Sequence, residues 1–485
     1  MSNSDVVLAT LFAYKIILLG IGFWSSRRIS NTTDFFLGGR QLGAFTAGLS
    51  YAASTSSAWV LLGFSGFVYS IGLSAVWMVP GIWAGYAVVW LYFGPRLHLE
   101  SQQHRQLTLT DFLLQDSQGD STRNTTAAVA ALLILLCFVF YIAAQFDAAG
   151  KALAEHFALS FTQAILVGAS IVIVYSLFGG FWAVSITDTV QAIVMLVVSI
   201  SVPAATVMAA GGFDALWQTL ETTMGPDYLS ISGGHSPLLF AGFVIGVMGM
   251  SLGALGQPHL ISRLMAIKNN QERIRGFGIV ITWGVVVFVG MILLGLAGRA
   301  LTPELASGET LFYQAAASYL PPIVAGVVVA ATLSAVMSTV DSILISAAGA
   351  VANDMGVNRR FPTAQLATSR LVMGAIAVLA IGLTLNLPDT IFNRVLFAWS
   401  ALGAAFGPII LWRVRGHQVS ARAALAAMLA GFATTVLFYT LGTMPASSNL
   451  LSQAAHLPGD PFERVVPWLP ALLALVFMSR TSPQD

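Results

Sequence analysis

The stretch that decides the fold reads Ser50-Tyr51-Ala52-Ala53-Ser54-Thr55-Ser56-Ser57-Ala58-Trp59. It places small and hydroxyl-bearing residues in the middle of an apolar segment, residues 44–70, that is long enough to cross a bilayer as a helix. Backbone groups freed from a membrane helix are tolerated only where they are buried in protein or line a cavity. This stretch therefore predicts an interrupted membrane helix.

A second interruption is predicted in residues 236–260, which read Gly246-Val247-Met248-Gly249-Met250-Ser251-Leu252-Gly253-Ala254-Leu255-Gly256 before Gln257-Pro258. The two interrupted segments lie five spans apart, so they cross the membrane in opposite directions. Small residues also allow membrane helices to pack closely, and either run alone favours that simpler interpretation. Two interruptions at matching, inverted positions favour the binding site of a transporter.

The composition supports a membrane protein. Of the 485 residues, 56% are hydrophobic and only 9% are charged, whereas a soluble domain carries about 25% charged residues. The net charge of +1 argues against a nucleic-acid partner. The single cysteine, Cys137, excludes a disulfide framework, and the seven scattered histidines indicate no metal site.

Thirteen apolar segments are long enough to span a bilayer as helices. Placing the N-terminus outside puts 17 of the 22 lysines and arginines, Arg263 among them, on the inner side, as the positive-inside bias expects. We expect the first span to be retained rather than cleaved, because Asp5 precedes it and Arg27 and Arg28 follow it. The predicted spans are 6–25, 44–70, 73–95, 125–150, 161–182, 186–211, 236–260, 275–298, 319–352, 368–386, 391–412, 420–442 and 466–481.

These spans predict one membrane domain with no soluble catalytic domain. In the external loop 212–235, the residues Phe213 to Trp217 predict a short interfacial helix. The predicted organisation is a peripheral first span and loop (1–42), a five-helix repeat (43–211), the external loop (212–235), an inverted second repeat (236–413) and two C-terminal spans (414–485).

Acidic residues inside predicted spans are the sharpest functional signal, because a charge in hydrocarbon is costly. Asp188 and Asp341 stand out in this way. Asp147 lies four residues before Lys151, a spacing that permits a simple ion pair, so we interpret it as structural. Around Asp341, helical spacing gathers oxygen-bearing side chains on one surface, and hard cations prefer oxygen ligands. Hydroxyls alone more often bond to their own helix, but the two acids favour a cation site.

Several motifs resemble the sodium/solute symporter family, particularly its bacterial sodium/proline branch. They lie in the same order from residue 35 to about residue 410, and they are Phe35-Phe36-Leu37-Gly38-Gly39-Arg40-Gln41-Leu42-Gly43, Gly179-Gly180-Phe181-Trp182-Ala183-Val184-Ser185, Gly256-Gln257-Pro258-His259, Ala335-Val336-Met337-Ser338-Thr339 and Ala398-Trp399-Ser400-Ala401-Leu402-Gly403. The resemblance implies an all-α, LeuT-like inverted-repeat fold and sodium-coupled symport of a small organic solute.

The resemblance also implies two cation sites. The family's main sodium site falls on Ala53, Ser56, Ala335, Ser338 and Thr339, with backbone carbonyls from the first three and hydroxyls from the last two. A second site, present in some members, falls on Asp188, Ser338, Asp341 and Ser342. The acid at position 341 departs from the family, which has hydroxyl residues there, so it strengthens a second cation site or carries a proton.

The implied solute pocket departs from the proline branch. Thr55 stands where that branch has an aspartate, Met250 where it has a tryptophan and Ala254 where it has a tyrosine, while Tyr141 is retained. We therefore expect a solute larger or less proline-like than proline, such as another amino acid or a small carboxylate. The residues expected to line its site are Thr55, Ser57, Trp59, Tyr141, Gln145, Met250 and Ala254.

The hypothesis from sequence is thus an inner-membrane symporter that works by alternating access. It needs no cofactor beyond the coupling sodium ion, is no enzyme, has its C-terminus in the cytoplasm and functions as a monomer. The alternative is a transporter-like sensor module. Because the chain ends at Asp485, such a module would need a separate signalling partner.

Overall fold

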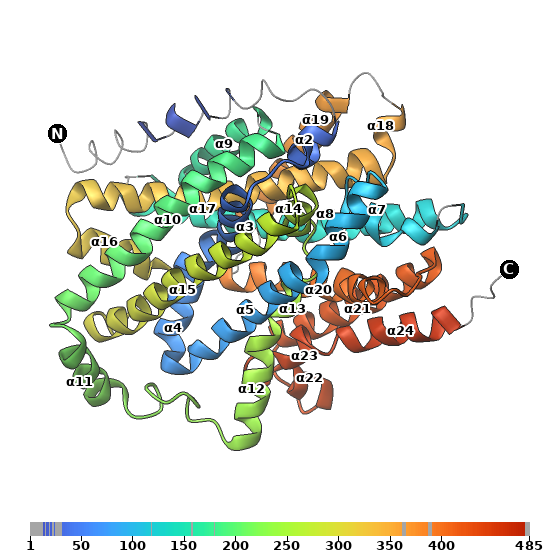
Figure 1. Cartoon of the computed structure of the whole chain (residues 1–485). Coiled ribbons are helices and arrows are strands. Elements are labelled where there is room, and N and C mark those ends of the chain that lie inside the picture. The colour runs from blue at the N-terminus through green and yellow to red at the C-terminus, as the bar shows by residue number, and fades with distance from the viewer. Residues whose placement is uncertain are drawn as a thin grey trace.

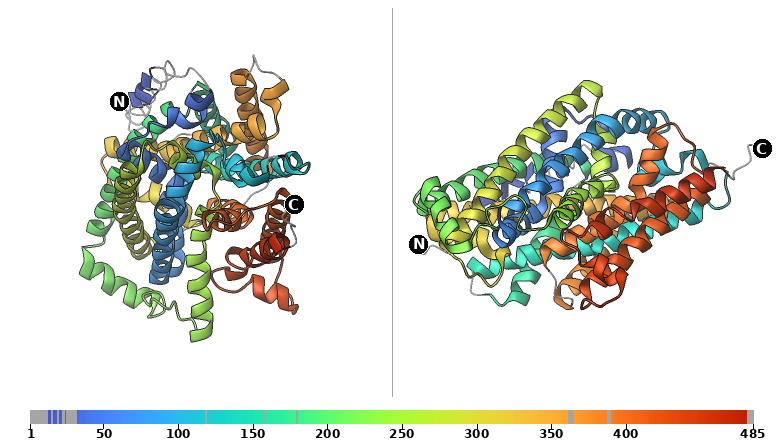
Figure 2. Two further views of the ribbon diagram at one scale, coloured as in Figure 1. Left: turned by 45° about the vertical axis from the view of Figure 1, so that its right-hand side comes forward. Right: turned by 90° about the horizontal axis from the view of Figure 1, so that it is seen from below.

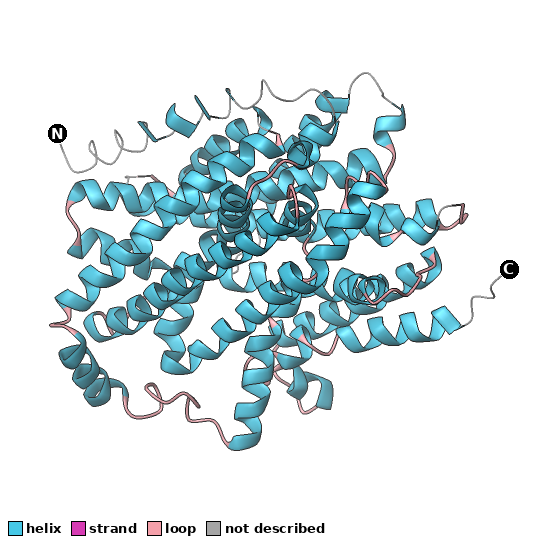
Figure 3. Cartoon of the chain, in the orientation of Figure 1, coloured by secondary structure: helices cyan, strands magenta, loops and turns pink. Residues whose placement is uncertain are grey.

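The computed structural model describes residues 13–14, 16–18, 20–21, 24, 32–117, 119–156, 159–178, 180–360, 365–386 and 390–480. This part of the chain is built from helices (Figure 3). In it the β-type contacts amount to one isolated bridge between Leu42 and Ile267. The predicted all-α class is confirmed. Most of the first predicted span, with Lys15, Arg27 and Arg28, lies outside the described residues.

The helices before residue 236 are coloured blue to green in Figure 1. They are α2 (Thr32–Leu37), η1 (Gly38–Arg40), α3 (Ala44–Ala58), η2 (Trp59–Phe64), α4 (Ser65–Ile71), η3 (Gly72–Trp77), α5 (Met78–Ala87), η4 (Val88–Phe93), α6 (Gly94–Gln103), α7 (Leu109–Leu113), η5 (Gln115–Ser117), α8 (Arg123–His156), α9 (Phe161–Phe178), α10 (Phe181–Ala209) and α11 (Phe213–Met224).

The remaining helices are α12 (Pro237–Gly249), α13 (Ser251–Ala254), α14 (Pro258–Ala266), α15 (Asn270–Leu301), η6 (Gly308–Thr310), α16 (Leu311–Tyr319), α17 (Pro322–Gly349), η7 (Ala350–Asp354), α18 (Val357–Arg360), α19 (Gln365–Asn386), α20 (Ile391–Val414), α21 (Ala421–Thr443), α22 (Leu450–Ala455), α23 (Pro461–Arg464) and α24 (Trp468–Arg480). The C-terminal helices α21 and α24 pack against each other along one side of the molecule (Figure 2).

Ten helical stretches in the described residues are long and apolar enough to cross a membrane. One of them, Ala44–Gln103, contains two of the predicted spans, and the chain reverses between them at Gly72, whose φ is 74°. The predicted span 161–182 needs correction, because α9 ends at Phe178 and Phe181 already begins α10. The count of thirteen stays a prediction.

The centre of the bundle is formed by α3, α17 and α20. The most apolar stretch of α17 is 83% buried and that of α20 is 89% buried, against 33% for α21. Helix α3 packs against α10, α15 and α17, while α8 packs against α17, α19 and α20. Helix α17 belongs to the predicted second repeat and packs against α3 and α8 of the predicted first repeat. Its residues can therefore form a site shared by the two predicted repeats.

The start of α3 is fixed to the loop that follows α14. The Leu42 amide donates to the Ala266 carbonyl (3.1 Å), and the Lys268 amide donates to the Leu42 carbonyl (3.0 Å). The first amide of α3, that of Ala44, donates to Glu272 Oε2 (2.6 Å). These bonds hold the start of α3, in the predicted first repeat, against the junction of α14 and α15 in the predicted second repeat.

Candidate functional site

The first predicted interruption is present, and its centre is Ser57. This residue has φ 48° and ψ −169° inside an otherwise helical segment. The freed amide of Ala58 donates to Oε1 of Gln145 on α8 (3.1 Å), and the amide of Trp59 donates to Ser57 Oγ (3.0 Å). Gln145, expected as a solute contact, therefore caps the second half of the broken helix.

The residues of the predicted main sodium site meet beside this break. Ser338 Oγ donates to the carbonyls of Ala53 on α3 (3.4 Å) and Ala335 on α17 (3.0 Å). Thr339 Oγ1 donates to the carbonyl of Ser54 (3.2 Å). The oxygens joined by these hydrogen bonds belong to carbonyl and hydroxyl groups. Such oxygens are the ligand type that a hard cation prefers.

Ser56 is buried one residue before the break. Within the described part of the chain its hydroxyl has no hydrogen-bond partner. The structure thus joins Ser338 to Ala53 and Ala335 by hydrogen bonds, and it joins Thr339 to α3 through Ser54. In the described residues, no hydrogen bond connects the Ser56 hydroxyl to this group.

The predicted second cation residues lie around an arginine that the sequence interpretation had placed among the inner-side basic residues. Arg263, on α14, is only 1% exposed, and its Nη2 lies 2.8 Å from Oδ2 of the fully buried Asp188 on α10. The same nitrogen donates to the hydroxyls of Ser54 (2.6 Å) and Ser342 (2.5 Å). Arg263 is therefore an interior residue. Helix α14 follows the second interruption and directs the Arg263 side chain toward α3, α10 and α17.

We use the name Arg263 cluster for the residues joined by these contacts, which are Ser50, Ser54, Asp188, Arg263 and Ser342. Ser50 Oγ donates to Asp188 Oδ2 (2.6 Å) and accepts from Arg263 Nε (2.9 Å). Of the four predicted residues, Asp188 and Ser342 belong to this cluster, and Ser338 joins it through its carbonyl, which accepts from Ser342 Oγ (2.7 Å). Asp341 is fully buried on the same helix.

The second predicted interruption is also present. Helix α12 ends at Gly249, the single turn α13 follows, and Gln257 is extended with φ −81° and ψ 110° before α14 begins. A Cβ on Gly256 would lie 2.2 Å from the carbonyl oxygen of Leu402 on α20. The glycines therefore let the broken segment approach α20, and Met250 and Ala254 are both buried there.

Within the described residues, buried polar atoms without a hydrogen-bond partner lie near the two breaks on Gln145, Gln257 and His259, while the Tyr141 hydroxyl faces Trp399 and Ser57. In the described residues, neither ring nitrogen of His259 and neither side-chain polar atom of Gln257 makes a hydrogen bond. The rings of His259 and Tyr141 lie 6.1 Å apart, edge to face. Such orphaned groups are costly, so a bound polar solute is a natural partner for them.

Two other predicted solute residues have different surroundings. Thr55 Oγ1 donates to the carbonyls of its own helix at Tyr51 (2.8 Å) and Ala52 (3.0 Å), which is the ordinary role of a buried helical threonine. Trp59 stacks on Phe392 at the start of α20, with ring centroids 6.0 Å apart. An aromatic pair therefore packs beside the break.

The predicted ion pair of Asp147 and Lys151 is confirmed at 2.9 Å, and it includes a third residue. Lys151 Nζ also lies 2.7 Å from Oε2 of Glu309, and Glu309 Oε1 accepts from the Phe392 amide (3.1 Å). Glu309 lies 158 residues from Lys151, so no spacing along the sequence predicts this contact.

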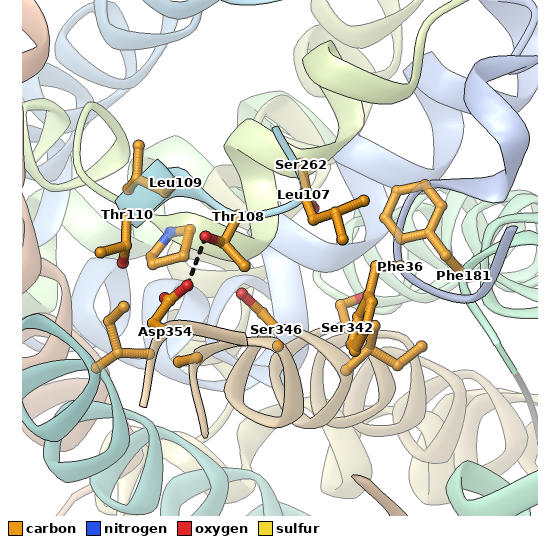
Figure 4. A pocket seen from close by; sticks show the side chains of 15 residues that line it. Phe36, Leu107, Thr108, Leu109, Thr110, Phe181, Ser262, Ser342, Ser346 and Asp354 are labelled. Carbon is orange, nitrogen blue, oxygen red and sulfur yellow. Dashed lines mark hydrogen bonds between the residues drawn. The ribbon is translucent and has the colours of Figure 1, made fainter. Parts of the chain in front are cut away.

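A small cavity adjoins the Arg263 cluster. Ser342, Ser346 and Asp354 lie along one side of α17 and η7 that lines it, opposite Thr108 (Figure 4). Thr108 Oγ1 donates to Asp354 Oδ1 (2.7 Å). The cavity therefore extends from Ser342 on α17 toward Asp354 at the end of η7.

Sequence reasoning missed Arg263 and Glu309 as site residues, and it quoted Gln257 and His259 only as a motif. A signal existed for these last two, because they follow directly on the glycine-rich run that predicts the break. Arg263 carried no such signal, because it lies beyond the predicted span 236–260 and its bond to the His259 carbonyl (2.5 Å) appears only in the structure.

Comparisons with known proteins identify the family of this chain. The model of the sodium:solute symporter family matches residues 35–431. The chain is 33% identical over 434 residues to the high-affinity proline transporter PutP of Bacillus subtilis, covering 88% of this chain and 90% of that protein. It is 31% identical over 455 residues to the sodium/proline symporter of Escherichia coli, covering 91% and 89%.

Solved structures show the same fold at low sequence identity. A Na+-coupled sialic acid symporter in a substrate-bound outward-open state matches with a TM-score of 0.78 and 15% identity, with 98% of each chain covered. MhsT in complex with L-phenylalanine matches with a TM-score of 0.56 and 14% identity, with 90% of this chain and 99% of that chain covered. The fold is therefore LeuT-like, and the protein crosses the membrane several times.

Proposed function

The chain belongs to the sodium:solute symporter family, and on that premise we propose that it carries a small organic solute, proline or another amino acid or small carboxylate, together with sodium by alternating access. Its role is transport rather than catalysis. The relatives at 31–33% identity are named as proline transporters, which makes proline the first solute to test.

One observation carries this proposal. At the break in α3, the Ala53 carbonyl meets the Ser338 hydroxyl of α17, and the neighbouring Thr339 hydroxyl meets the Ser54 carbonyl. A sodium ion bound by Ala53, Ser56, Ala335, Ser338 and Thr339 would join the two helices. Because the ion bridges elements of both repeats, its binding favours one of the alternating states, and this difference is the physical basis of coupling.

The solute site lies, in this proposal, between the two breaks and α8. Gln257 and His259 supply polar atoms that have no partner among the described residues, and the ring of Tyr141 lies beside that of His259. Met250 and Ala254 form an apolar wall, and a methionine wall adapts to irregular shapes. With Thr55 bonded to its own helix, no carboxylate at that position orients the amino group of a solute. Ser57 and Trp59 flank the site at the break.

The proposed membrane is the bacterial inner membrane, with residues 43–211 and 236–413 as the two inverted repeats. The N-terminus lies outside, because that orientation places most arginines and lysines on the inner side. We propose that one chain contains the complete path, so that a monomer suffices.

Uptake of radiolabelled proline into proteoliposomes, with and without an inward sodium gradient, tests this function. We expect accumulation above equilibrium only with the gradient, for proline or for a solute found by a thermal-shift screen of amino acids and small carboxylates. Tight sodium-dependent binding without uptake of any ligand would contradict transport and favour the sensor alternative.

A further inference from the structure

Nη2 of Arg263 has the surroundings of a bound cation. Three oxygens contact it, from Asp188 Oδ2 (2.8 Å), Ser54 Oγ (2.6 Å) and Ser342 Oγ (2.5 Å). They come from α10, α3 and α17, so the nitrogen joins three helices. The other guanidinium nitrogens are used as well, Nε by Ser50 and Nη1 by the His259 carbonyl.

The same oxygens would suit a sodium ion. A carboxylate and hydroxyls make an all-oxygen site of the kind that hard cations prefer. A guanidinium keeps its charge at any physiological pH and cannot leave. A sodium ion brought to these oxygens would meet the positive charge of Arg263 at the distance of a direct contact, among buried side chains.

The Arg263 cluster also adjoins the proposed main sodium site. Ser54 supplies its carbonyl to Thr339 and its hydroxyl to Arg263. Ser338 supplies its hydroxyl to Ala53 and its carbonyl to Ser342. Two cation positions therefore lie side by side between α3 and α17.

We propose that Arg263 is the resident cation of this second position, so that the protein couples its solute to one dissociable sodium ion instead of two. The inference rests on the proposed function for the first sodium ion. In this proposal, Arg263 determines how many sodium ions accompany each solute. Its guanidinium permanently balances the charge of Asp188, and only the ion at the main site moves with the solute.

Equilibrium binding of sodium-22 to the purified protein tests the assignment without knowledge of the solute. We expect one sodium ion per chain in the parent and two in Arg263→Gln, because the glutamine removes the positive charge and leaves the oxygens of Asp188, Ser54 and Ser342. Arg263→Lys keeps the charge and should bind one. Arg415→Gln, which changes an exposed arginine, is the matched control and should also bind one.

Charge movement gives a second, independent readout. For a solute without net charge, such as proline, the charge moved per solute, taken from reversal potentials in proteoliposomes, should be one in the parent and in Arg263→Lys, and should double in Arg263→Gln. Two sodium ions bound by the parent would overturn the assignment, and so would a folded Arg263→Gln protein that binds only one.

Failure of the proposed function gives a different result. A parent that binds no sodium would contradict the main sodium site, whereas a gain of one ion in Arg263→Gln relative to that parent would still support the role of Arg263. If Arg263→Gln does not fold, the parent decides: a count of one in the parent and in Arg263→Lys supports the assignment, and a count of two in either overturns it.

Discussion

Arg263 and Asp188, 75 residues apart in the sequence, form an ion pair of 2.8 Å in which the arginine is 1% exposed and the aspartate fully buried. The pair fixes α14, the second half of one broken helix, to α10 of the other predicted repeat. Any movement of the repeats past each other must therefore carry this pair intact or separate two buried charges. Separation without a replacement ion is costly, which makes the pair a constraint on the transport cycle.

Asp188→Asn should destabilise the protein by about 3–5 kcal/mol, because it leaves the Arg263 charge buried without its partner. The double variant Asp188→Asn with Arg263→Gln should recover a large part of this loss, since it removes both charges. Thermal unfolding of the purified proteins at one detergent and salt concentration measures the coupling. Additive losses in the double variant would show that the two residues act independently.

Ser338→Ala with Thr339→Ala should raise the sodium concentration for half-maximal uptake by about tenfold or more, because about 1.4 kcal/mol of lost ligand binding gives a factor of ten. Protein abundance should change little. Thr332→Ala is the control, because Thr332 lies on the same helix and donates only to the Val328 carbonyl one turn earlier. An unchanged sodium dependence in the double variant would remove the main sodium site from the proposal.

Gln145→Leu should lower stability by about 1–3 kcal/mol, because the Ala58 amide at the break loses its acceptor and stays buried. Gln191→Leu is the matched control, since Gln191 is fully buried and, among the described residues, neither of its side-chain polar atoms has a partner. Removing that amide should change stability little. Equal melting temperatures for the two variants would contradict the capping role of Gln145.

Lys151→Met should destabilise the link between α8 and the start of α20 by about 1–3 kcal/mol, because Asp147 and Glu309 lose their shared cation. Glu309→Gln should cost less, since its amide oxygen can still accept from the Phe392 amide. Thermal unfolding again provides the measurement. A smaller loss in Lys151→Met than in Glu309→Gln would show that the backbone bond matters more than the charges.

Met250→Trp with Ala254→Tyr should weaken binding of the native solute and improve binding of proline, because two large aromatics would narrow the proposed solute site at the buried positions 250 and 254. Competition against a labelled solute, across a panel of amino acids and small carboxylates, measures the effect. If proline is the tightest competitor of the unchanged protein, the pocket recognises proline with residues other than those of the sodium/proline branch.

The sequence by itself determined the membrane class, the all-helical architecture and both interruptions. These depend on local properties: the apolar length of each segment, and runs of small residues such as Ser50 to Trp59 that interrupt it. The oxygen-bearing face of α17 and the pair of Asp147 with Lys151 were also predictable, because both follow from neighbours three or four residues apart on one helix.

Only the tertiary structure decided which distant residues complete these sites. Gln145 caps the break at Ala58 across 87 residues, and Glu309 joins Lys151 across 158 residues. The charge of Arg263 predicts an inner loop by the positive-inside bias, and only the packing of α14 between α3, α10 and α17 turns its side chain onto Asp188. Such contacts depend on how helices are oriented against one another, and the periodicity of a single helix carries no information about its partner's register.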